Sequence, residues 1–172
     1  MRPLFSLLLL VCLASPAQGS WVKSYSLDAL YREADLVVRG AVIDSTSFWN
    51  DEHDRIYTEY EIAPSHLFKG QSSTPIRVRL MGGIVGDKEL IISGNPTITK
   101  GEDVLLFLRS VPNFYVVVGM SQGKWSVRDI DGTPHVFRGK SQGALEKADG
   151  EIPLERLLEK CGVGHQSRKG VQ

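Results

Sequence analysis

The residue types that most often carry chemistry gather at Asp51–Asp54, where His53 lies among three carboxylates. Carboxylate oxygens and an imidazole nitrogen are ligands of divalent cations. Four adjacent residues converge on one ion only when a fixed turn folds them back, and no glycine is present here to supply that turn. We therefore interpret this cluster as a solvated hairpin loop, and we predict no metal site.

Two other short motifs resemble parts of ion or phosphate sites. The segment Asp129-Ile130-Asp131-Gly132 begins like a calcium loop, but it lacks the third acidic ligand and the distal glutamate, so we predict a β-turn. The glycines Gly82, Gly83 and Gly86 precede neither a Gly-Lys-Ser/Thr sequence nor a predicted helix whose N-terminus could hold an anion. We expect no cofactor.

Catalytic side chains do not form a recognisable set. The chain contains no HExxH motif, and we expect no serine in a Gly-x-Ser-x-Gly elbow. His66, His135 and His165 fall on separate elements. Cys161 lies on or just past an amphipathic helix, where a small apolar packing residue is commoner than a nucleophile. We predict that the protein is not an enzyme. The alternative of a different class is a hydrolase with a site assembled around His66 or His135.

An aromatic pair, Phe48-Trp49, provides the strongest signal for binding. It lies in the polar stretch Ser45–Arg55, which we predict to be a loop between two strands. A loop tryptophan either folds back over the end of a barrel or, when exposed, forms an anchor of the kind enriched at partner interfaces. Outward residues of the two following strands extend this surface. The predicted binding residues are Phe48, Trp49, Tyr57, Arg77 and Arg79.

The strands that must position this surface begin after residue 34. Asp35–Asp44 is predicted to be the first strand, with Gly40 at a bulge or bend. Ile56–Leu67 alternates apolar and polar residues until Pro64, which implies an edge position, a bulge or a bend. Pro75–Leu80 is the third predicted strand, with its isoleucine, valine and leucine inward and its two arginines outward.

The most strongly patterned segment is Gly101–Val127. It contains the apolar runs Val104–Leu108 and Phe114–Val118, separated by a turn at Pro112-Asn113. Uninterrupted apolar runs of this length indicate strands that are covered on both faces, so we expect the core here. A hairpin formed by Lys124–Asp129 and His135–Arg138 follows.

Only two helices and one weak strand complete the pattern. Ser26 is predicted to cap a helix over Leu27–Ala34, and Pro153 to begin a second helix that reaches about Lys160. A weak strand is expected at Glu89–Ile92. Many short strands without an alternating strand–helix order predict an all-β barrel or sandwich with short peripheral helices at its N- and C-terminal ends. The bends expected at Gly40, Pro64 and Gly82–Gly86 favour the small barrel.

The first nineteen residues have the features of a secretory signal peptide. Arg2 precedes the apolar run Leu4–Leu13, and Ala17-Gln18-Gly19 is a small-x-small cleavage signal. We therefore predict a mature chain from Ser20, a single domain over 20–163 and a disordered tail over 164–172. The expected location is secreted or periplasmic. No stretch approaches the roughly twenty apolar residues of a membrane span.

Charge and cysteine content narrow the possible partners. The whole chain has 20 basic and 20 acidic residues, and the leader removes only Arg2. A balance this close to neutral offers no general attraction to nucleic acid or to anionic lipid, and it favours a protein, peptide or glycan partner. The mature chain keeps one cysteine, Cys161, so no internal disulfide can form.

Three segments in order resemble a known group of modules. These are Ala34–Val42 (ADLVVRGAV), Leu67–Gly70 (LFKG) and Gly101–Leu108 (GEDVLLFL). The series resembles netrin-like modules, including the inhibitory domain of the tissue inhibitors of metalloproteinases, and it is similar above all to exported bacterial proteins of that shape without an assigned activity. This resemblance implies a five-stranded OB-like barrel over residues 26–128 with flanking helices.

One departure limits what the resemblance implies about function. The metalloproteinase inhibitors chelate zinc through an N-terminal cysteine that disulfides hold in place, whereas the predicted N-terminus here is Ser20-Trp21-Val22. No functional residue is therefore transferred from that family. We predict a non-catalytic binding or interaction module whose ligand is unknown, and the alternative within binding is a protease inhibitor that acts through its loops.

Overall fold

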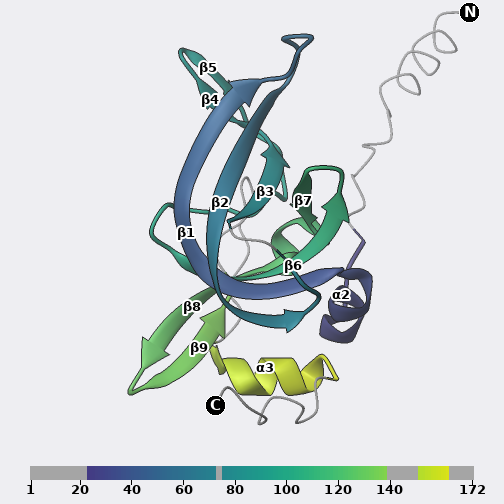
Figure 1. The fold of residues 1–172 in the computed structure, drawn as a ribbon, viewed down its shortest axis with the longest axis vertical. Coiled ribbons are helices and arrows are strands. Elements are labelled where there is room, and N and C mark those ends of the chain that lie inside the picture. Colours follow the sequence, from purple (N-terminus) through teal and green to yellow (C-terminus); the bar gives the residue numbers. More distant parts are fainter. Residues whose placement is uncertain (1–22, 73–74, 139–150, 163–172) are drawn as a thin grey trace, which may run out of the picture.

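The computed structural model describes residues 23–72, 75–138 and 151–162 (Figure 1). The helices are α2 (Leu27–Glu33), α3 (Leu154–Lys160) and the 3₁₀-helix η1 (Met120–Gly123). The strands are β1 (Leu36–Trp49), β2 (Ile56–Lys69), β3 (Ile76–Met81), β4 (Gly83–Val85), β5 (Lys88–Leu90), β6 (Asp103–Val111), β7 (Phe114–Val117), β8 (Lys124–Ile130), β9 (Thr133–Phe137) and β10 (Ile152–Pro153). The predicted all-β fold with short helices near both ends is confirmed. The predicted leader and tail lie outside the described residues.

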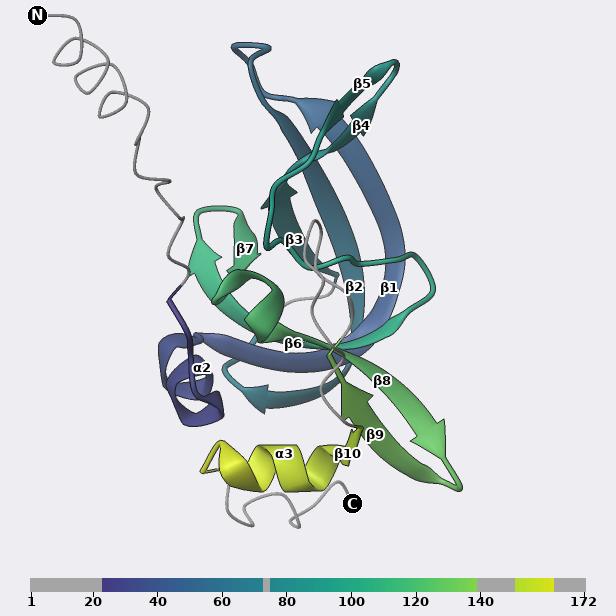
Figure 2. The ribbon, with the colours of Figure 1, turned by 180° about the vertical axis from the view of Figure 1, so that it is seen from behind.

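Five strands close a ring of pairings in the order β1–β2–β3–β7–β6 and back to β1. Four of these contacts are antiparallel, whereas β3 and β7 are parallel and pair through Val78 and Tyr115. Strands β8, β9 and β10 extend the sheet outward from the first half of β6, and Figure 2 shows the β8–β9 hairpin projecting away from the ring.

Strand β6 separates two apolar cores. Val104, Leu106 and Leu108 face the interior of the ring, where they pack among the inward residues of β1, β2 and β3. Leu105 and Phe107 face the opposite side and pack under the helices. All five side chains are fully buried. The prediction that this apolar run is covered on both faces is therefore confirmed, and it explains why the run does not alternate.

Both helices cover the second core. Helix α2 begins where Ser26 Oγ accepts a hydrogen bond from the Ala29 amide at 3.2 Å, as predicted, and its Leu30 is fully buried. Helix α3 inserts Leu154 and Leu157 beside it. Burying each leucine contributes about 2 kcal/mol. A left-handed Gly162 with φ 78° follows α3, as expected for a helix end.

The prediction of a loop over Ser45–Arg55 is wrong for its first half. Strand β1 continues to Trp49, with Phe48 opposite Tyr57 and Ser47 opposite Thr58, and only residues 50–55 form the turn. The hydroxyls of Ser47 and Thr58 lie 2.8 Å apart across the two strands. This end of the hairpin extends beyond both cores, so its residues lack the apolar alternation from which strands are predicted.

Bends in the first two strands occur at the predicted positions. The pairing of β1 with β2 shifts register between Arg39 and Gly40, opposite Pro64, which confirms the bulge. A Cβ on Gly40 would lie 2.4 Å from the Ala63 carbonyl oxygen, so only glycine allows this approach. The weak strand predicted at Glu89–Ile92 is shorter and begins earlier, because β5 (Lys88–Leu90) pairs as a tight hairpin with β4. No helix among the described residues is long and apolar enough to cross a membrane.

Candidate functional site

Six side chains gather on the outer surface of the ring, and we call them the outer cluster. On β2 and β3 the outward positions alternate with buried ones, because Ile56, Thr58, Ile76 and Val78 face inward. Strand β1 adds an aromatic residue at its end and β7 adds one at its start. The members of the outer cluster are Phe48, Tyr57, Glu59, Arg77, Arg79 and Phe114.

Arg79 is the centre of the outer cluster. Its guanidinium carbon lies 5.1 Å from the ring centroid of Phe48 and 4.2 Å from that of Phe114. Its Nε and Nη2 donate to Glu59 Oε2 at 3.2 and 2.8 Å. Cation–π contacts on two sides and a charge-assisted pair together fix this side chain, which joins β1, β2, β3 and β7 into one surface.

Cross-strand stacking extends the aromatic part of the cluster. Phe48 and Tyr57 are directly opposite each other on β1 and β2, and their ring centroids lie 6.4 Å apart with planes inclined by 28°. Both side chains are half-buried. Aromatic pairs of this kind contribute about 0.2–1 kcal/mol to the sheet and leave rigid faces that cost little entropy on binding.

Arg77 is held much less firmly than Arg79. Its Nη1 lies 4.0 Å from Glu59 Oε1, at the outer limit of an ion pair, and its side chain is 52% exposed. The Arg79 side chain, in contrast, is 30% exposed and binds the same carboxylate at 2.8 Å. Most of the Arg77 donors therefore face solvent and are available to a ligand.

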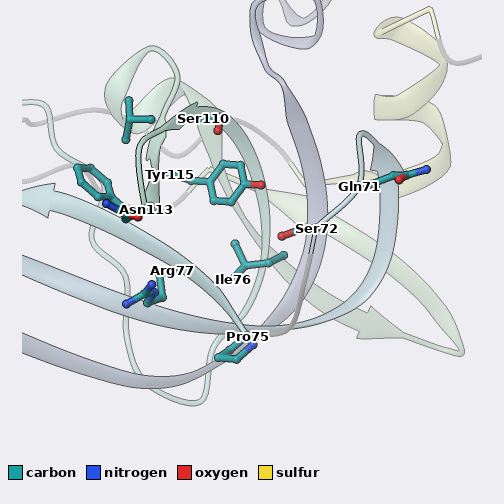
Figure 3. Close-up of a pocket in the computed structure, with 10 residues that line it drawn as sticks. Gln71, Ser72, Pro75, Ile76, Arg77, Ser110, Asn113 and Tyr115 are labelled. Atoms are coloured by element: carbon teal, nitrogen blue, oxygen red, sulfur yellow. The ribbon is translucent and has the colours of Figure 1, made fainter.

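A pocket of about 410 Å³ adjoins the cluster at Arg77 and Phe114. It lies between the end of β2 and start of β3 on one side and the β6–β7 turn on the other, and we call it the end pocket. Figure 3 shows Arg77 and Asn113 at one side of it, Ser72 and Gln71 at the other, and Tyr115 between them. Small-ligand pockets are typically about 300–1,000 Å³, so the end pocket has room for a small ligand.

Four of the five predicted binding residues therefore lie together, and Trp49 lies apart from them. Trp49 is opposite Ile56, so it points to the other side of the hairpin from Phe48. Its ring stacks on His53, with centroids 6.3 Å apart and planes inclined by 17°. Glu59 is expected from the same alternation to face outward beside Tyr57, and it joins the other four. Phe114 is the member without a prediction, because nothing in the sequence places it beside Arg79.

The turn at 50–55 is organised by a residue that the sequence analysis did not single out. Asn50 Nδ2 donates to the Glu52 and Asp54 carboxylates at 2.6 Å each, and its Oδ1 accepts from the Asp54 and Arg55 amides. His53 supplies the left-handed conformation, with φ 56°, that a glycine often provides. No group of three or more His, Cys, Asp or Glu residues could hold a metal ion in the described ranges.

The histidines show no acid–base pairing in the described part of the chain. His66 is exposed, and its Nδ1 lies 3.3 Å from Ser65 Oγ. His135 Nδ1 lies 3.0 Å from the Thr133 carbonyl oxygen. Neither contacts a carboxylate among the described residues, and His165 lies outside them. This placement gives no support to the hydrolase alternative.

One motif that could carry chemistry escaped the sequence analysis. Gly119-Met120-Ser121-Gln122-Gly123 has the Gly-x-Ser-x-Gly pattern of serine hydrolases. It forms the 3₁₀-helix η1 between β7 and β8, whereas the hydrolase pattern requires a turn from a strand into an α-helix. No described histidine hydrogen-bonds Ser121, and Gln122 instead binds the Lys23 carbonyl oxygen and the Tyr25 amide. The segment therefore ties the residues before α2, Lys23 and Tyr25, to the sheet.

A buried polar cluster lies away from the outer surface. Lys124 is 4% exposed, and its Nζ lies 2.5 Å from Glu102 Oε1 and donates to Ser126 Oγ at 2.8 Å. Ser126 in turn donates to the same Glu102 oxygen. Each polar group thus has a partner, and the ammonium is ion-paired, so it is not available as a general base. We interpret this cluster as structural.

Cys161 belongs to the second core. It is 2% exposed among Leu30, Leu157 and their neighbours. Burial, with a smaller effect from the Asp28 carboxylate, raises the pKa of its thiol to about 11. A thiol in this state is not a thiolate nucleophile near neutral pH.

No family model matches the chain, and no curated protein matches it.

Proposed function

We propose that the chain is an exported, non-catalytic binding module that holds a peptide or glycan against its outer cluster. The observation that carries this proposal is Arg79, fixed between the rings of Phe48 and Phe114 on an outward surface. Aromatic residues and arginines held rigidly together are common among the interface residues that contribute most to binding energy. Because the fold already orders these side chains, they lose little further entropy when a ligand binds.

The position of the cluster supports the same conclusion. A ring of five strands with β3 and β7 parallel is compatible with the OB-like, netrin-like barrel that the sequence resembles. Barrels of this class bind ligands on the face of their second and third strands. In this chain β2 and β3 provide Tyr57, Glu59, Arg77 and Arg79, which are four of the six members of the outer cluster.

Charge favours a peptide or glycan over nucleic acid. In the outer cluster Arg77 and Arg79 face Glu59, and Glu61 is the register partner of Arg77 on β2. Two cations next to two carboxylates leave this surface without a net positive charge, whereas a phosphate backbone is bound mainly through several positive charges that release its counterions.

The proposal is tested by capture of ligand with the mature chain, residues 20–172, from the fluid into which the producing cells export their proteins. We expect Phe48→Ala and Phe114→Ala to lose most of the captured material. The matched control is Phe137→Ala, because Phe137 also lies under an arginine, with Arg128 4.9 Å from its ring, but on the β8–β9 hairpin. Equal capture by all three variants, or measurable turnover of the captured material, would contradict the proposal.

Export is part of the proposal and has its own test. Edman sequencing of the protein recovered outside the cytoplasm should begin at Ser20-Trp21-Val22. Retention of Met1 in the recovered protein would contradict the assignment of residues 1–19 as a cleaved signal peptide.

A protease inhibitor is the second candidate, and the rigid turn at 50–55 favours it. Figure 1 shows this turn at the projecting end of the β1–β2 hairpin, far from α3, and Asn50 holds it with four side-chain hydrogen bonds. Pre-organised protruding loops suit an inhibitor because they lose little conformational freedom on binding. Failure of the mature chain to slow any metalloprotease or serine protease exported by the same cells would exclude this candidate.

A further inference from the structure

The end pocket has a composition that differs from that of most small-ligand pockets. Such pockets are lined predominantly by apolar side chains with a few polar groups. Here five of the ten lining residues carry a polar side chain, among them Ser110 and Asn113, and two aromatic residues, Phe114 and Tyr115, lie beside them. A ligand with many hydroxyl groups loses hydrogen bonds to water when it enters a pocket, and a polar lining can replace them. A lipid or an aliphatic side chain would instead leave the polar groups of the lining unpaired.

Charge limits the ligand further. Among the described residues that line the end pocket, Arg77 is the one charged side chain. Its guanidinium keeps donors free because its contact with Glu59 is 4.0 Å long. An arginine with free donors favours a carboxylate, which it can bind through two parallel hydrogen bonds. One cation also favours a ligand with a single negative charge at this position over a polyanion.

The two aromatic residues at the pocket, Phe114 and Tyr115, differ in their contacts. The face of Phe114 that meets Arg79 is already occupied. Tyr115 is half-buried, packs against the ring interior, and its hydroxyl makes no hydrogen bond with any described residue. A phenol in this state offers an apolar ring face to the C–H side of a sugar and a hydroxyl to its polar edge.

From these observations we infer that the end pocket binds an acidic sugar, a monosaccharide or disaccharide unit with one carboxylate, with Arg77 on the carboxylate and Tyr115 against the ring. The inference rests on the proposed binding function and narrows its ligand class. A peptide that added a strand is disfavoured at this position because little main-chain edge is left for it: β3 pairs with β2 from Ile76 to Met81 and already meets β7 at Val78.

The test uses an array of immobilised di- and trisaccharides that end in glucuronate, galacturonate or N-acetylneuraminate, with neutral and sulfated oligosaccharides and peptides with a free C-terminal carboxylate beside them. We expect the mature chain to bind carboxylated sugars. Titration calorimetry with the best of these sugars and with its methyl ester should show about tenfold or more weaker binding of the ester. Equal binding of the ester, stronger binding of sulfated or neutral sugars, binding of peptides alone, or no binding would each overturn the inference.

Variants separate this inference from the broader proposal. Arg77→Gln should weaken binding of the free acid about tenfold and leave binding of the ester nearly unchanged, and Arg77→Lys should retain part of the affinity. Arg156→Gln, an exposed arginine on α3, is the matched control and should have no effect. If ligand capture still depends on Phe48 but not on Arg77, and the free sugar acid does not compete, the acidic-sugar inference fails while the binding module stands.

Discussion

At the scale of single residues, the structure separates two arginines that the sequence presents as equivalent. Arg77 and Arg79 are both outward residues of one strand, but only Arg79 meets Phe48, Phe114 and Glu59 together. Alternation in β3 predicts that both face outward, and it cannot predict the partners, because these come from β1, β2 and β7. Under the proposed function, Arg79 holds the surface together and Arg77 presents its free donors to the ligand.

The first prediction concerns the buried cluster of Lys124, Glu102 and Ser126. Lys124→Met leaves the Glu102 carboxylate, 21% exposed, without its cation, so we expect the free energy of unfolding to fall by about 2–4 kcal/mol in urea denaturation. The double variant Lys124→Met/Glu102→Leu removes both charges and should recover most of that loss. A single variant that unfolds within about 0.5 kcal/mol of the wild type would show that this ion pair has no structural role.

The second prediction concerns Cys161 and alkaline pH. Folding raises the pKa of this thiol from its ordinary value of 9.0 to about 11, so the unfolded chain loses the proton first. The thiol's contribution to stability is therefore complete below pH 9 and declines as the pH rises towards 11. We expect Cys161→Ala to lack that part of the decline in urea denaturation curves measured across this range. The native thiol should also resist iodoacetamide at neutral pH, and rapid alkylation of the folded protein would contradict its burial.

At the scale of elements, the strands with a covered face were predictable and the projecting part of the hairpin was not. Val104–Leu108 is apolar throughout because β6 divides two cores, and this pattern identifies it from sequence alone. Ser45–Trp49 is equally extended but faces neither core, so its strand conformation comes from pairing with β2, which no local pattern encodes. The prediction of a loop there failed for that reason, and the outer cluster begins at this segment.

The third prediction concerns the turn at 50–55. Asn50→Ala removes the hydrogen bonds to Glu52, Asp54 and Arg55, so we expect faster amide exchange and faster proteolysis at the turn, with the melting temperature of the ring changed little. Glu52→Gln is the matched control, because its side-chain amide oxygen can still accept from Asn50. Unchanged exchange in Asn50→Ala would show that strand pairing alone holds the turn.

The fourth prediction tests the close approach of Gly40 on β1 to the bulged part of β2. Gly40→Ala places a Cβ 2.4 Å from the Ala63 carbonyl oxygen, an approach that side-chain rotation cannot relieve. We expect a loss of about 2 kcal/mol or more in urea denaturation, in line with other changes that force the backbone to move. Leu67→Ala, on an exposed side chain of the same hairpin, should cost much less. Comparable losses in the two variants would contradict a backbone contact at Gly40.

At the scale of the whole molecule, the described side chains that are available to a ligand lie at the surface. The interior holds apolar side chains and polar groups that bind one another. The two cores are apolar, the buried polar groups of Lys124, Glu102 and Ser126 satisfy one another, and Cys161 is enclosed. The fold class followed from strand spacing, and four of the five predicted binding residues met on one surface. The end pocket was not predictable, because β2, β3, β6 and β7 create it only when the ring closes.

The outer cluster and the adjoining end pocket are proposed to form one binding surface. The most direct measurement is a map of amide chemical-shift changes in the isotope-labelled mature chain as ligand captured by that chain is added. We predict that the largest changes fall on Tyr57, Arg77, Arg79 and the β6–β7 turn, and that the β8–β9 hairpin stays unchanged. Changes centred on β8–β9 or on the turn at 50–55, with the outer cluster unaffected, would contradict the claim.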